Sequence, residues 1–105
     1  MNQVVTWDNT INAVMPQFER IARVNNHVRW QEESQFALQA IQNNSLLSKC
    51  NVTSIQNSII NVAAVGLTLN PADQYAYLVP EGGACNLKIS FKGLVKIATD
   101  SGSIA

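Results

Sequence analysis

The sequence predicts an α+β domain in which three helices precede an antiparallel β-hairpin and a short helix follows it, in the order α-α-α-β-β-α. Two observations predict this order. Apolar residues recur every three or four positions over roughly the first 70 residues, and then alternate with polar residues on both sides of a Gly-Gly pair. A chain of 105 residues with 47% hydrophobic residues supports one core, so we treat residues 1–105 as a single domain.

The first two helices are predicted from Asp8 to Val24 and from Arg29 to Asn43. Pro16 leaves two alternatives for the first: the helix bends there, or a second helix starts with Pro16 in its first turn. Glu32 and Glu33 fall in the first turn of the Arg29 helix, where carboxylates favour the positive end of the helix dipole. We interpret this pair as a helix-start preference, since adjacent helical residues do not face each other as a catalytic pair would.

A third helix is predicted from a capping box at Thr53–Gln56 to a stop at Gly66. In this box the Thr53 hydroxyl and the Gln56 amide would satisfy free N–H groups at the helix start. The expected buried face comprises Ile55, Ile59, Val62 and Ala63, and the expected polar face comprises Ser54, Asn57, Ser58 and Asn61.

The hairpin is predicted from strands at Tyr75–Val79 and Leu87–Phe91, joined by a tight turn at Gly82-Gly83. A two-residue turn at the glycines sets the register. The aliphatic face would then pair Leu78 with Leu87, Ala76 with Ile89 and Gln74 with Phe91, and the other face would pair Tyr77 with Lys88 and Tyr75 with Ser90. A last helix is predicted from Gly93 to Asp100, with Gly102 just past its end.

The candidate binding residues lie on the aromatic and basic face of this hairpin and on the last helix: Tyr75, Tyr77, Lys88, Lys92 and Lys96. Exposed aromatic rings can stack on bases while ammonium groups contact phosphates, which suits single-stranded nucleic acid. Two other interpretations stay open, namely that the lysines are only solvated and that the tyrosines are half-buried sheet residues. A register slip of one residue would also move both tyrosines to the apolar face.

The composition limits the other classes of function. Charged residues make up 13% of the chain, and seven basic residues balance seven acidic ones. This excludes nucleic-acid binding through an overall basic charge but not through a local basic patch. Cys50, Cys85 and His27 have no metal-ligand or disulfide spacing, so we expect the cysteines to be small apolar core residues. No nucleophile–base set is visible. We therefore expect no catalytic residues, no metal, no cofactor and no enzyme activity.

The location follows from the start of the chain and from its longest uncharged stretch. The N-terminus carries no secretory signal, and the uncharged stretch from Cys50 to Ala72 contains too many polar residues for a membrane span. We expect a cytoplasmic protein without a membrane partner.

The segment from Thr53 to Ile104 contains SIINVAAVGLTLNPADQYAYLVP and, after a glycine-containing turn, NLKISFKGLVKIATDSGSI. A helix ending in Gly-Leu, an Asn-Pro turn, the AYLVP strand, an aromatic-basic-Gly step and a helix ending in Ser-Gly follow one another. In this order and spacing the segment resembles the RecT/Redβ family of phage-type single-strand annealing recombinases.

The resemblance implies ATP-independent binding of single-stranded DNA, annealing of complementary strands and assembly into rings or filaments. It also implies a partner exonuclease and the cytoplasm of a bacterial host, for a phage or prophage protein. Lys92 matches the basic position of the aromatic-basic-Gly step, between Phe91 and Gly93. Family members are considerably longer, so we expect this chain to be the N-terminal part of a larger single-strand annealing protein. The alternative is a small oligomerisation or protein-interaction module that binds no nucleic acid.

Overall fold

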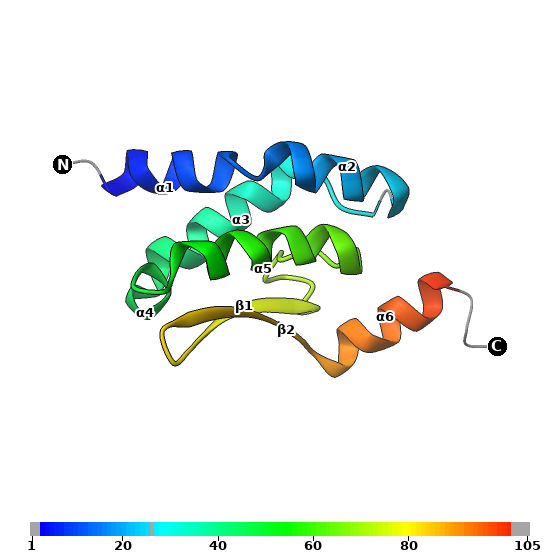
Figure 1. Cartoon of the computed structure of the whole chain (residues 1–105). Coiled ribbons are helices and arrows are strands. Elements are labelled where there is room, and N and C mark those ends of the chain that lie inside the picture. Colours follow the sequence, from blue (N-terminus) through cyan, green and yellow to red (C-terminus); the bar gives the residue numbers. More distant parts are fainter. Residues whose placement is uncertain (1–2, 26, 102–105) are drawn as a thin grey trace.

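A computed structural model describes residues 3–25 and 27–101 and confirms the predicted α+β layout of helices, a two-stranded antiparallel sheet and a final helix (Figure 1). The elements in chain order are α1 (Gln3–Asn12), α2 (Met15–Asn25), α3 (Trp30–Asn43), α4 (Ser45–Ser48), α5 (Val52–Val65), β1 (Ala76–Glu81), β2 (Ala84–Ile89) and α6 (Phe91–Ser101).

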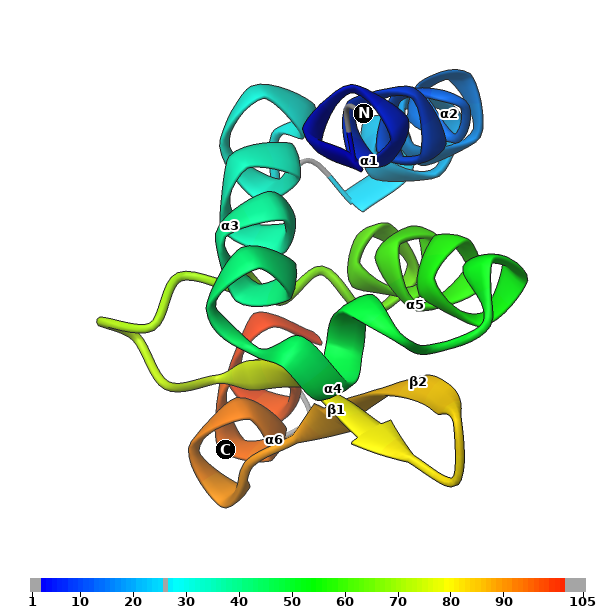
Figure 2. The ribbon, with the colours of Figure 1, turned by 90° about the vertical axis from the view of Figure 1, so that its left-hand side faces the viewer.

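The elements form layers around α5. Helices α1 and α2 lie almost end to end on one side of α5, and the hairpin lies on its other side (Figure 1). Helix α3 runs from the α1–α2 layer toward the hairpin and closes the side of the core (Figure 2). Helix α6 follows the hairpin and projects away from the body (Figure 1). The outer face of the hairpin and much of α6 are therefore left uncovered by the other helices.

The first predicted helix is two helices, which confirms the second alternative for Pro16. Helix α1 ends at Asn12, and Pro16 is the second residue of α2. A proline in the first turn costs little there, because the first N–H groups of a helix have no partner within it. Phe18 of α2 is fully buried and packs edge-on against Trp30, with ring centroids 5.3 Å apart.

Helix α5 has the predicted buried face, since Ile55, Ile59, Val62 and Ala63 are each 0% exposed. Its predicted start is wrong. Asn51 caps the helix through a side-chain oxygen that accepts from the Ser54 amide at 3.2 Å. Asparagine is among the strongest N-capping residues, and here it precedes Thr53 by two positions. The side-chain amide of Gln56, which was expected to complete the capping box, donates instead to the Thr10 carbonyl at 3.0 Å.

Two of the four residues assigned to the polar face of α5 point to the hairpin instead. Ser58 is buried and donates to the Cys85 carbonyl at 2.9 Å, while the Cys85 amide donates to Ser54 Oγ at 2.8 Å. Asn57 and Asn61 are exposed as expected. The difference arises because α5 is covered on two sides, by α2 and by β2. Hydroxyl groups on the side that faces β2 form hydrogen bonds with backbone groups of that strand, which would otherwise lack partners.

The predicted hairpin register is confirmed, with Ala76 opposite Ile89, Tyr77 opposite Lys88 and Leu78 opposite Leu87. Gly82 and Gly83 have φ values of 58° and 82°, which a tight hairpin turn requires at both positions. Both strands extend closer to the turn than predicted.

The predicted pairing of Gln74 with Phe91 is wrong. Gln74 has a φ of 57° and lies outside β1, and Phe91 is the first residue of α6. Helix α6 starts two residues before the predicted Gly93, because Ser90 Oγ accepts from the Gly93 amide at 3.0 Å and so satisfies the helix start. The position expected for Gly102 lies outside the described residues.

Glu33 has a larger role than its place in the first turn of α3 indicates. Its side chain is buried, with Oε1 accepting from the Leu69 amide at 2.7 Å and Oε2 accepting from Thr68 Oγ1 at 2.6 Å. Burial raises the pKa of the Glu33 carboxyl above its usual value of 4.5, although both hydrogen bonds act in the opposite direction. Glu33 thereby ties the segment after α5 to α3.

Candidate nucleic-acid interface

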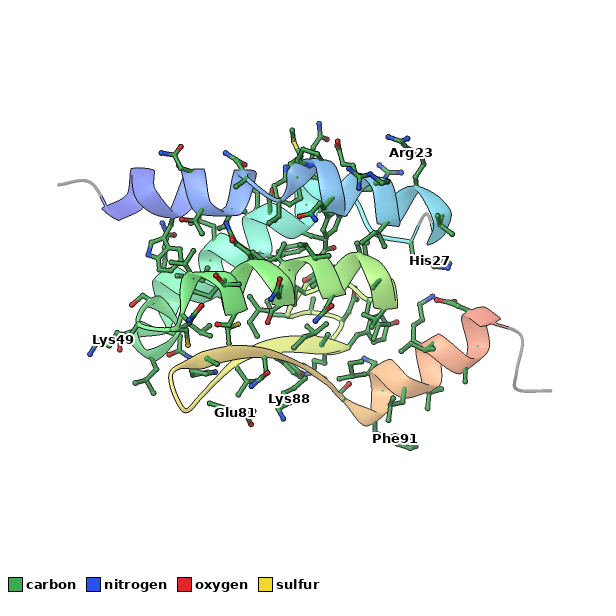
Figure 3. The ribbon with its side chains drawn as sticks, viewed as in Figure 1. Arg23, His27, Lys49, Glu81, Lys88 and Phe91 are labelled. Atoms are coloured by element: carbon green, nitrogen blue, oxygen red, sulfur yellow. The ribbon has the colours of Figure 1, made fainter. Side chains whose placement is uncertain are left out.

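The two faces of the hairpin differ in exposure. Ala76, Leu78 and Cys85 are buried beneath the helices, whereas Tyr77 and its register partner Lys88 are exposed on the outer face. Figure 3 shows Lys88 pointing away from the helices, to the same side as Phe91 and Glu81. The structure therefore brings Tyr77 and Lys88 together on the solvent side, as their predicted register requires.

Tyr75 and Lys92 form the second pair of predicted residues that the structure brings together. Tyr75 is half-buried just before β1, and Lys92 lies in the first turn of α6. The Lys92 Nζ atom is 5.7 Å from the centroid of the Tyr75 ring, within the range of a cation–π interaction. Because the ammonium group covers that ring face, Tyr75 acts there as a support for Lys92.

The other two lysines of the predicted site are held by carboxylates. Lys88 Nζ lies 3.2 Å from Glu81 Oε2, and Lys96 Nζ lies 2.8 Å from Asp100 Oδ1. The hydrogen bond to Asp100 is the main cause that raises the pKa of Lys96. Among the lysines of this region, in the described part of the chain, Lys92 alone has no ion-pair partner. The basic stripe predicted from sequence is therefore partly neutralised.

Gly93 explains how α6 comes close enough to place Lys92 over Tyr75. It is buried, and a Cβ atom at this position would clash with the Tyr75 carbonyl oxygen and lie 2.9 Å from Ile89 Cγ2. Real Cβ contacts are longer, since carbon atoms pack at about 3.5–4.0 Å. Only glycine at position 93 lets the first turn of α6 rest directly on the backbone at the start of β1.

Phe91 is an exposed aromatic residue that the sequence reasoning placed on the aliphatic face of the hairpin. It is 81% exposed at the first position of α6, next to Lys92. The signal that could have found it is Ser90, a favoured N-cap residue that turns the chain into a helix before Phe91 can continue the strand. Leu94 and Val95 are also exposed and extend the apolar surface along α6.

The described residues contain no group of three or more His, Cys, Asp and Glu side chains placed to hold a metal ion. Cys50 and Cys85 are buried free thiols, as expected for apolar core residues, and burial raises the pKa of the Cys85 thiol. None of the helices within residues 3–25 and 27–101 is long and apolar enough to cross a membrane.

The outer face of the hairpin and the start of α6 offer aromatic rings and ammonium groups. Aromatic rings can stack on bases, and ammonium groups can contact phosphates.

Comparison with known proteins identifies the family of this segment. The model of the RecT family matches residues 31–105, which extend from the second residue of α3 through α6 and include every residue of the candidate interface. No curated protein and no solved structure matches the chain.

Proposed function

Because the chain belongs to the RecT family, we propose that it binds single-stranded DNA and anneals complementary strands without ATP, in phage-type homologous recombination. The association of this family with annealing and DNA recombination supports the proposal. We assign the binding to a surface that we call the DNA face, made of Tyr75, Tyr77, Lys88, Phe91, Lys92 and Lys96. The observation that carries this assignment is the unpaired Lys92 between a supporting tyrosine and an exposed phenylalanine.

Each residue of the DNA face has a separate role in this proposal. Lys92 contacts a phosphate, and Tyr75 holds its ammonium group in place. Tyr77 and Phe91, which are 42% and 81% exposed, stack on bases. Stacking on an aromatic side chain contributes about 1–3 kcal/mol per base and tolerates any base. Lys88 contributes less than Lys92, and so does Lys96 on the next turn of α6, because each must first leave its carboxylate partner.

This mode of binding is compatible with annealing. Contacts to phosphates and to base faces leave the Watson–Crick edges of the bases free for a second strand. Phosphate contacts also position a strand without selecting its sequence. An annealing protein needs both properties, since it must accept any strand and then present it for pairing.

The test is the salt dependence of binding to a fluorescent oligothymidylate, measured by fluorescence anisotropy for the native chain and for Lys92→Gln. Each neutralised phosphate on a single strand contributes about −0.7 to the slope of log affinity against log salt. We expect Lys92→Gln to reduce the magnitude of the slope by about 0.7 and to weaken binding equally for oligonucleotides of different sequence.

Lys88→Gln and Lys96→Gln are the matched controls, since each removes one positive charge that is already paired. Both are expected to change the slope less than Lys92→Gln does, and Glu81→Gln is expected to strengthen binding by freeing Lys88. An unchanged affinity and slope for a folded Lys92→Gln variant would show that the DNA path lies elsewhere. No binding by the native chain would favour the alternative of an interaction module without nucleic acid.

The proposal includes self-association into a homo-oligomer. Leu94 and Val95 on the projecting helix α6 are 54% and 41% exposed, and neighbouring exposed apolar residues mark interaction surfaces. Light scattering of the native chain and of Leu94→Lys tests this, with a smaller mass expected for the variant at equal concentration. A strict monomer at high concentration would contradict it.

The proposal also includes a partner exonuclease and a location in the bacterial cytoplasm, as for a phage or prophage protein.

A further inference from the structure

The basic residues of the chain are divided between two regions. All three arginines, Arg20, Arg23 and Arg29, and the single histidine, His27, lie within ten residues of one another, whereas the four lysines lie at position 49 and beyond. This arginine segment spans the end of α2 and the start of α3. In Figure 3, Arg23 projects from the side of the molecule opposite to Lys88, so this region is separate from the DNA face.

A cleft of about 360 Å³ lies in the arginine segment, between α2 and the start of α3. Its lining consists of Glu19, Ala22, Arg23, Val28, Arg29, Trp30 and Gln31. Ala22, Val28 and Trp30 are buried core residues, so they form a firm apolar floor, and Arg23 and Arg29 are exposed at its walls. The cleft is wide open to solvent, so both guanidinium groups are accessible to an anion from solution.

The two arginines of the cleft are not neutralised by the protein. Unlike Lys88 and Lys96, neither Arg23 nor Arg29 has an ion-pair partner within the described ranges. Glu19 also lines the cleft, which leaves two guanidinium groups against one carboxylate. Arginine presents a planar set of donors that matches a phosphate group, and its weak hydration lowers the cost of contact with an anion.

The start of α3 lies beside the same cleft, since Trp30 and Gln31 are among its lining residues. Arg29 is the N-cap residue but makes no side-chain cap hydrogen bond. The first backbone hydrogen bond of this turn runs from the Glu32 amide to the Arg29 carbonyl at 3.1 Å, so the amides of Trp30 and Gln31 precede it. Such amides carry the positive end of the helix dipole and favour an anion beside them.

From the unpaired guanidinium groups at this cleft we propose that Arg23 and Arg29 form a phosphate-binding site between α2 and α3. The shared chemistry is a phosphate group, whether it belongs to a nucleic-acid backbone or to a free phosphate or nucleotide. The proposal does not depend on the annealing function, because Arg23 and Arg29 lie before the residues 31–105 that match the family. If the source is a DNA strand, the subunit would contact DNA on a second side.

The experiment is a titration followed by two-dimensional amide NMR with three separate probes: inorganic phosphate, thymidine monophosphate and a short oligothymidylate. We expect saturable shifts of the Trp30 and Gln31 amides and of the side-chain Nε–H groups of Arg23 and Arg29, with a Kd of about 1 mM or tighter. Arg23→Gln and Arg29→Gln should each weaken binding at least about tenfold, since each removes a charge-assisted hydrogen bond.

Arg20→Gln is the matched control, because it removes the same charge from α2 but does not line the cleft. It should change the affinity by less than about twofold, since salt screens an exposed charge outside the site. Glu19→Gln should strengthen binding by removing the carboxylate. Arg23→Lys and Arg29→Lys replace the glutamine variants if those lose the native spectrum, and should bind more weakly than the native chain because the planar donor set is lost.

The three probes distinguish the sources. Saturation by inorganic phosphate or by thymidine monophosphate supports a site for free phosphate, and saturation by the oligothymidylate alone supports a site for the nucleic-acid backbone. The proposal is overturned if no probe gives saturable shifts at the cleft, or if Arg20→Gln weakens binding as much as Arg23→Gln. Lys92→Gln should leave phosphate binding at the cleft unchanged, so a failure here is independent of a failure at the DNA face.

Discussion

Gly93→Ala tests the contact that positions the DNA face. In an exposed helix interior this substitution stabilises by about 1 kcal/mol, because alanine has the higher helix propensity. At Gly93 the added methyl group would meet the Tyr75 carbonyl oxygen and lie 2.9 Å from Ile89 Cγ2 and 3.1 Å from the Tyr75 carbonyl carbon. Carbon atoms prefer about 3.5–4.0 Å, so the first turn of α6 must withdraw by roughly 0.5–1 Å.

The cost of this overpacking exceeds the gain in propensity. Inserting a methyl group into a well-packed site costs typically about 1–3 kcal/mol. We therefore expect a net loss of about 1 kcal/mol and a fall in Tm of about 4–8 °C for a chain of this size. Because Lys92 moves with α6, oligonucleotide binding should weaken even at temperatures where the variant is fully folded.

Thermal unfolding followed by circular dichroism, together with fluorescence anisotropy, measures both effects. Thr99→Ala is the matched control, since Thr99 is exposed on the same helix, and there the propensity gain should raise Tm slightly. A Gly93→Ala variant that is more stable than the native chain would refute the reasoning, because it would show that α6 does not rest on the Tyr75 backbone.

Substitutions at three further places test the fold that supports the site: the hairpin turn, the start of α5 and Glu33. Gly82→Val and Gly83→Val should each lower the free energy of unfolding, measured in urea, by about 1–2 kcal/mol. The whole cost comes from the positive φ of 58° and 82°, since nothing lies within 4 Å of either added Cβ. Unchanged stability in both variants would contradict a tight turn at these glycines. Asn51→Ala should cost about 1 kcal/mol by removing the cap of α5, whereas Thr53→Ala should cost far less. Equal losses would support the predicted capping role of Thr53. Glu33→Ala should cost about 1–3 kcal/mol by leaving a buried amide without its acceptor, and Glu33→Gln less. Because the pKa of Glu33 is raised above 4.5, the native state binds the Glu33 carboxyl proton more tightly than the unfolded state does. The stability that this proton contributes is present below pH 4.5 and is lost as the pH rises through the raised pKa. The stability of the native chain relative to Glu33→Gln should thus fall as the pH rises above about 4.5, and a rise would contradict the assigned shift.

The parts of the fold that the sequence predicted are those set by local rules. The Gly82-Gly83 turn alone determines the hairpin register, and the apolar spacing of α5 determines its buried face. Ser54 and Ser58 could not be assigned in the same way. The helical repeat places Ser54 and Ser58 on one side of α5, but whether that side is covered depends on the position of β2, about thirty residues later in the chain.

The candidate site shows the same division. The pairing of Tyr77 with Lys88 follows from the predicted register. The ion pair of Lys96 with Asp100 was not predicted, although their i, i+4 spacing favours it. The contact between Lys92 and Tyr75 depends on the angle at which α6 leaves β2, which only the packing around Gly93 decides. Phe91 was misplaced because one residue, Ser90, ends the strand before the alternation of apolar and polar residues does.

The aromatic-basic-Gly step can now be understood as one geometric unit. Gly93 allows the start of α6 to lie against the backbone of Tyr75, and that close approach places Lys92 over the Tyr75 ring. The same helix start turns Phe91 out of the hairpin, so that its ring is 81% exposed beside the lysine. The packing requires that position 93 carry no side chain. The proposed DNA binding adds a flexible cation at position 92 and a flat apolar ring at position 91. Lys92→Arg should accordingly be tolerated in binding, because it keeps the cation and the contact with the Tyr75 ring. Phe91→Leu should keep the fold but weaken binding, because it keeps the apolar side chain and loses the stacking surface. Equal binding by Phe91→Leu and the native chain would remove Phe91 from the DNA face and leave Tyr77 as its stacking residue.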